Sequence, residues 1–171
     1  MPVRPSKLWK ELSVEKRLAV ADAFWRDEQG VDQQVEAIVT LARRLNFRAK
    51  SVQALPIERR AKHLAQVSDV SDAVATRALI AYHFLAERPL MAAFLDAVGI
   101  AHEDGLITAD DIGAPAPAVL ATAVDKVRGM FPADTVSLYL RTLVAIDPDT
   151  WGTLEADAEM TEAKGQRELT G

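Results

Sequence analysis

The sequence predicts an all-α protein, folded as a compact bundle of about eight helices joined by short loops. Three observations lead to this fold class. Ala and Leu, which are strong helix formers, are the commonest residues of the 171-residue chain, and Arg and Glu add further helix-forming residues. Apolar residues recur every three or four positions and do not alternate as in strands. Most prolines and glycines stand at the ends of these periodic segments, where helices start and stop.

Residues typical of helix ends mark where each predicted helix begins and stops along the chain. Ser13 and Ser71 are typical N-cap residues, and Pro56 and Pro89 suit the first position of a helix. Gly30 and Gly99 suit the position just after one, and the sequence around Gly99 fits a Schellman motif. Helices are therefore expected over residues 14–28, 31–45, 48–55, 56–67, 72–87, 89–98, 117–131 and 133–146, with a last amphipathic piece from about residue 150.

The segment 31–45 is expected to carry its apolar residues on one side. Val31, Val35, Ile38, Leu41 and Leu45 recur at helical spacing and fall on that side.

Length favours a single helical domain over residues 1–160, followed by a polar tail over residues 161–171 that frays. A short α-solenoid with HEAT-like repeats is the minor alternative. It rests on one internal sequence similarity, between LSVEKRLAVA from Leu12 and LPIERRAKHLA from Leu55. The chain has no third copy of this segment.

The chain contains no cysteine, which excludes disulfides, thiolate metal sites and a cysteine nucleophile. Its first residues carry charges and prolines and do not form the apolar centre of a signal peptide. No apolar run approaches the roughly 18 residues that a membrane span needs. The sequence therefore predicts a soluble, cytoplasmic protein that does not bind membranes.

Charge is unevenly placed along the chain. The first 63 residues hold 13 of the 20 basic residues but only 8 of the 25 acidic ones. A basic stretch over residues 43–62 could contact phosphates, with Arg44, Arg48, Arg59 and Arg60 as the candidate side chains. No nucleic-acid-binding motif accompanies it, and the isoelectric point is near 5.2. An anion or nucleic-acid binder is therefore the second alternative, and nucleic acid is not the expected partner.

The segment GIAHEDGLITADD, residues 99–111, resembles part of an EF-hand calcium loop when Gly105 takes its central glycine position. It lacks a side-chain oxygen at the first ligand position, Ile100. A transition-metal site using His83, His102 and Asp104 is a further candidate, since nitrogen and carboxylate ligands suit such metals. The favoured interpretation is a turn that ends one helix, with Gly105 making a second turn.

Nucleotide-binding and hydrolase motifs are absent from the sequence. His83 lies between Tyr82 and Phe84 in an apolar helix, so we expect it to be partly buried and hydrogen-bonded. The sequence therefore favours a protein-interaction or self-associating module over an enzyme, without a cofactor. A small metal protein or enzyme using His83, His102 and nearby carboxylates is the first alternative.

Overall fold

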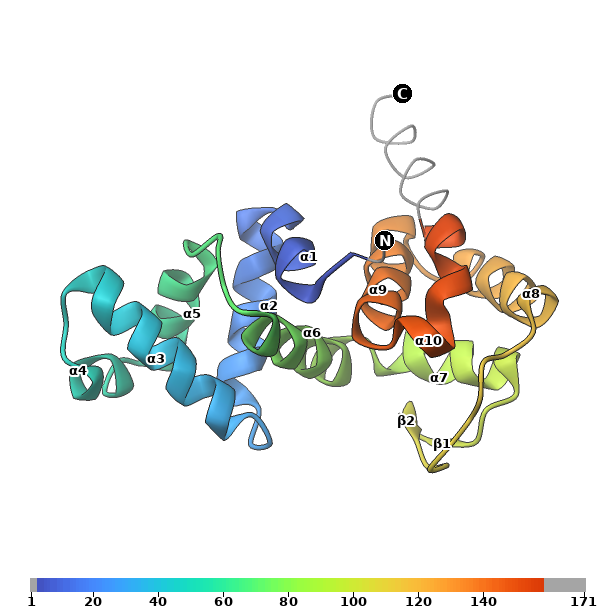
Figure 1. Ribbon diagram of the computed structural model, residues 1–171, viewed down its shortest axis with the longest axis horizontal. Coiled ribbons are helices and arrows are strands. Elements are labelled where there is room, and N and C mark those ends of the chain that lie inside the picture. Colours follow the sequence, from blue (N-terminus) through green and yellow to red (C-terminus); the bar gives the residue numbers. More distant parts are fainter. Residues whose placement is uncertain (1–2, 159–171) are drawn as a thin grey trace, which may run out of the picture. The chain divides into compact units, whose positions relative to one another are not determined.

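A computed structural model describes residues 3–158, and the described chain is helical almost throughout (Figure 1). The predicted all-α, multi-helix fold is confirmed. The chain divides into two compact units, unit 2 over residues 4–85 and unit 1 over residues 86–171 together with residues 1–3. The single domain over residues 1–160 stays a prediction, and the predicted tail over residues 161–171 lies outside the described residues.

Unit 2 consists of helices only. They are α1 (Pro5–Glu11), α2 (Val14–Arg26), α3 (Val31–Leu45), α4 (Ala49–Gln53), α5 (Ile57–Ala65) and α6 (Asp72–Ala86), whose last residue lies at the boundary. Helix α1 has the Pro5 start signal but was not predicted, because seven residues are too few to show a helical repeat. Ser13 caps α2 as predicted, its side chain accepting a hydrogen bond from the Lys16 amide.

The core of unit 2 forms where α2 packs along α5. These two helices contain the two similar segments of the sequence, which therefore pack against each other within one unit. Trp9 of α1 is fully buried, and its indole N–H donates to the Val67 carbonyl over 2.8 Å. Arg17 of α2 donates to the Ala65 carbonyl at the end of α5 over 2.9 Å. These two bonds give a partner to the buried indole N–H of Trp9 and to the backbone carbonyls of Val67 and Ala65.

Unit 1 contains four helices, a small hairpin and a short 3-10 turn among its described residues. They are α7 (Arg88–Val98), β1 (His102–Glu103), β2 (Leu106–Ile107), α8 (Pro117–Arg128), α9 (Ala133–Ile146), α10 (Pro148–Trp151) and η1 (Gly152–Leu154). An aromatic group of α7, α9 and α10 fills its core. The Phe94 ring meets Tyr139 edge-on, with centroids 5.5 Å apart, and lies 5.8 Å from Trp151.

The segment after α7 folds as predicted at its start and differently in its middle. Gly99 adopts a left-handed conformation, and the Ile100 amide donates to the Leu95 carbonyl over 3.0 Å, which completes the predicted Schellman motif. Beyond it, Asp104 and Gly105 both have positive φ and connect β1 to antiparallel β2. This geometry is that of a two-residue type I′ hairpin, so the simple turn expected at Gly105 joins two paired strands.

Within residues 3–158 no single helix is both long and apolar enough to cross a membrane. Helices α6 and α7 satisfy that test only when counted together across the bend between them.

Candidate functional site

Helix α3 exposes a stripe of large apolar side chains to solvent. Val31, Val35 and Val39 follow each other at four-residue spacing and are 57%, 56% and 41% exposed. Phe47, just beyond the helix, is 49% exposed. We call Val31, Val35, Val39 and Phe47 the valine face. Its three valines lie on one side of the helix because four residues turn an α-helix only slightly beyond a full circle.

The valine face exists because α3 is apolar over more of its circumference than unit 2 covers. Ala37 and Leu41 point into the core and are at most 1% exposed. At 100° per residue Val31 lies about a quarter-turn from Leu41, and Val35 lies about a third of a turn from it. The apolar side predicted for this helix is therefore buried only in part. Helical spacing identified residues that share a side but not how much of that side the neighbouring helices cover.

Phe47 is linked to the C-terminal end of the face by the way α3 stops. Asn46 takes a left-handed conformation, and the Phe47 amide donates to the Ala42 carbonyl over 2.9 Å. In this Schellman arrangement the residue after the left-handed one commonly packs on the last turn of the helix. Ala42 lies on the same side as Val35 and Val39. Phe47 therefore follows directly on the end of the helix that carries the three valines.

One edge of the valine face carries charges of both signs in a fixed order. Asp32 and Glu36 stand near the start of α3, and Arg43 stands near its end. At 100° per residue all three project on the same edge of the stripe. All three are exposed, and none forms an ion pair within residues 3–158. Their charges are therefore available to a partner.

The candidate metal ligands do not form a cluster. His83 belongs to unit 2, whereas His102 and Asp104 belong to the hairpin of unit 1. Both nitrogens of His102 are engaged, Nε2 with the Asp96 carboxylate at 2.7 Å and Nδ1 as acceptor of the Gly105 amide at 3.0 Å. Within residues 3–158, no group of three or more His, Cys, Asp or Glu side chains is arranged to hold a metal ion.

His83 is a buried histidine of α6. It is 3% exposed, and its Nδ1–H donates to the Leu79 carbonyl one turn earlier over 2.8 Å. Burial lowers the pKa of His83 to about 4, so the ring is neutral at neutral pH. This matches the hydrogen-bonded, buried histidine that its apolar neighbours indicated.

The four candidate arginines all belong to unit 2, and the fold already uses two of them. Arg44 donates to the Gln66 carbonyl over 3.2 Å, and the Arg60 guanidinium lies 5.0 Å from the centre of the Trp25 ring. Arg48 and Arg59 are exposed. The basic stretch is therefore spread over the end of α3, the start of α4 and α5, with part of its charge directed at unit 2 itself.

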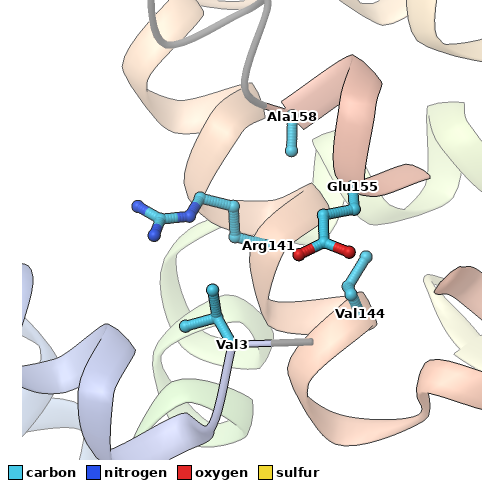
Figure 2. A pocket seen from close by; sticks show the side chains of 5 residues that line it. All are labelled: Val3, Arg141, Val144, Glu155 and Ala158. Atoms are coloured by element: carbon cyan, nitrogen blue, oxygen red, sulfur yellow. The ribbon is translucent and has the colours of Figure 1, made fainter. Parts of the chain in front are cut away.

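A small pocket in unit 1 is lined by Val3, Arg141, Val144, Glu155 and Ala158 (Figure 2). Its volume is about 40 Å³. That space suits water molecules and is far below the several hundred Å³ of a typical small-molecule site. In Figure 2 the Glu155 carboxylate points toward the space beside Val144, whereas the Arg141 guanidinium extends away from it. The pocket is too small to bind an organic substrate in this form.

Comparisons of the chain with protein families, curated proteins and solved structures gave no match.

Proposed function

We propose that this chain is a cytoplasmic interaction module that binds a protein partner through the valine face of α3. The single observation that carries the proposal is that Val31, Val35 and Val39, on one side of α3, and Phe47 just beyond the helix are all large apolar side chains exposed to solvent. Scattered apolar residues on a surface are ordinary, but a contiguous stripe along one helix is typical of a recognition surface. The partner surface that fits it is the apolar side of another helix.

The chemistry of the stripe supports docking. A valine in a helix is almost restricted to one side-chain rotamer, so it loses little conformational entropy when a partner covers it. Phe47 adds an aromatic side chain at one end, of the kind that anchors many interfaces. The charged edge formed by Asp32, Glu36 and Arg43 supplies a polar rim.

The alternative functions have weaker support. A metal protein or enzyme would need side chains that converge on one point. Instead, His83 and His102 each make a hydrogen bond with a neighbouring residue, and Asp104 forms an ion pair with Arg88. A nucleic-acid binder would need a basic surface, and two of the four arginines make contacts within unit 2, Arg44 with the Gln66 carbonyl and Arg60 with the Trp25 ring. The proposal therefore includes no catalytic step and no cofactor.

The test is photo-crosslinking in the cells that naturally produce the protein, with a photoreactive amino acid incorporated at position 35. The same residue at position 119 is the control, because Val119 is 40% exposed on α8, a helix of the other unit. We expect a specific adduct from position 35, identified by mass spectrometry, and none from position 119. Purified partner should then bind the Val35→Glu variant at least tenfold more weakly than the unchanged protein. Equal adducts from both positions would overturn the proposal.

A further inference from the structure

We propose that the partner seated on the valine face is a second copy of this chain, with the two α3 helices packed antiparallel about a two-fold axis. This inference rests on the proposed function and specifies its partner. It follows from how the charges along the edge of the valine face are ordered.

The charged edge of α3 is complementary to itself in only one orientation. When two identical helices pack antiparallel through the same face, the same edge of each helix meets its copy with the chain direction reversed. Asp32 near the start of one helix then lies opposite Arg43 near the end of the other, and this pair occurs twice, whereas the two copies of Glu36 lie near the middle. In a parallel pair this edge would instead meet the opposite edge of the partner's face, so Asp32 and Arg43 would not approach each other.

The same arrangement aligns the apolar side chains. A two-fold axis near residues 37 and 38 brings Asp32 opposite the partner's Arg43 and places Val35 and Val39 at the centre. Phe47 then lies at the edge of the contact, near the partner's Val31. Such an interface is isologous, because residue pairs occur twice. The antiparallel helix dipoles add to its stability.

The valine face is one helix wide, so the expected dimer is a reversible one of moderate affinity. Its charge pairs are exposed and screened by salt, so they fix orientation more than they add affinity. The apolar centre at Val35 and Val39 supplies most of the binding free energy.

The experiment is sedimentation velocity of the purified full chain from low micromolar to millimolar concentration. We expect reversible dimerisation that Val35→Glu abolishes, because each dimer would bury two unpaired carboxylates near its centre. Val119→Glu is the matched control and should dimerise normally, since that valine is exposed on another helix. Glu has a higher helix propensity than Val, so α3 itself should persist in the variant, as circular dichroism can verify.

Charge reversal tests the orientation. Asp32→Arg and Arg43→Asp should each weaken the dimer several-fold, because like charges then meet twice. The double variant D32R/R43D should recover most of the affinity, since every pair is again of opposite sign. Failure of the double variant to recover would overturn the antiparallel arrangement.

The outcomes separate this inference from the proposed function. A chain that stays monomeric at millimolar concentration, but gives a crosslink from position 35 to a different protein, overturns the second copy and leaves the interaction module. A monomeric chain without any specific crosslink overturns both. A crosslinked product with twice the mass of the chain supports both.

Discussion

The imidazole of His83 is held neutral by the interior of unit 2. Burial is the main cause of its lowered pKa of about 4, and the nearby positive charge of Lys16 lowers the pKa further. The hydrogen bond to the Leu79 carbonyl opposes this shift but does not cancel it. A proton on this ring therefore costs stability, and the buried position links folding to pH.

Acidification should destabilise the protein through His83. In the unfolded chain the ring binds a proton below its ordinary pKa of 6.5, but in the folded chain only below about 4. Stability due to this group is therefore complete above pH 6.5 and is lost as pH falls toward 4. The expected loss is about 3 kcal/mol in the free energy of unfolding. Urea denaturation at several pH values between 7 and 4 measures it.

His83→Gln is the control for this pH dependence. Glutamine can still donate to the Leu79 carbonyl but has no titrating group. The decline in stability between pH 6.5 and 4 should therefore be shallower in the variant, by at most about 1.4 kcal/mol per pH unit. An unchanged slope would mean that other groups cause the acid sensitivity.

The hairpin of unit 1 depends on the backbone of Gly105 and on the space beside it. Its φ of +89° is one that residues with a side chain rarely adopt. A Cβ added here would lie 3.0 Å from Cβ of Met91 on α7. Arg88 of the same helix forms an ion pair with Asp104 over 3.1 Å. One central residue of the turn is therefore paired with α7, and the other, Gly105, lies close against it.

Gly105→Ala should therefore destabilise the protein by about 1–3 kcal/mol, because conformational strain adds to the close contact with Met91. Gly113→Ala is the matched control. Gly113 also has positive φ, +59°, but a Cβ there would meet nothing within 4 Å. Gly113→Ala should lower the free energy of unfolding by less, because only the strain of the positive φ contributes and no close contact is made. Equal losses in urea denaturation would show that the contact with α7 is unimportant.

Helices of this protein are encoded locally, and this is why sequence signals found most of them. Ser13 caps α2 through its own side chain, and α3 begins and ends at the predicted residues. The hairpin was harder to predict, because strands of two residues are too short to show alternation, although the pair Asp104–Gly105 is a known hairpin signal.

Surface exposure was the feature that the sequence could not supply. Val31, Val35 and Leu41 have similar hydrophobicity and helical spacing, yet Leu41 is buried and the two valines are more than half exposed. The difference depends on where α5 and α4 pack against α3, which is a property of the tertiary fold. The valine face, and with it the candidate interaction site, therefore became visible only in the structure. The predicted histidine and arginine candidates were chosen by residue type alone.

At the scale of the whole molecule, each unit has the features of an independently folding piece. Unit 2 buries large side chains from five of its helices, which include Trp9, Phe24, Leu41, Leu64 and Leu79. Its long-range hydrogen bonds, such as Trp9 to Val67 and Arg17 to Ala65, close within residues 4–85. Helix α3 and the entire valine face also belong to this unit.

A fragment of residues 4–85 should therefore fold by itself and keep the capacity to self-associate. We expect one cooperative thermal transition, with a Tm that rises with protein concentration because dimerisation stabilises only the folded state. The Val35→Glu fragment should unfold cooperatively with a Tm independent of concentration. A fragment that melts without cooperativity would show that unit 2 needs unit 1 to fold. If the full chain dimerises but the fragment unfolds cooperatively with a Tm that does not depend on concentration, the dimer contact lies outside α3.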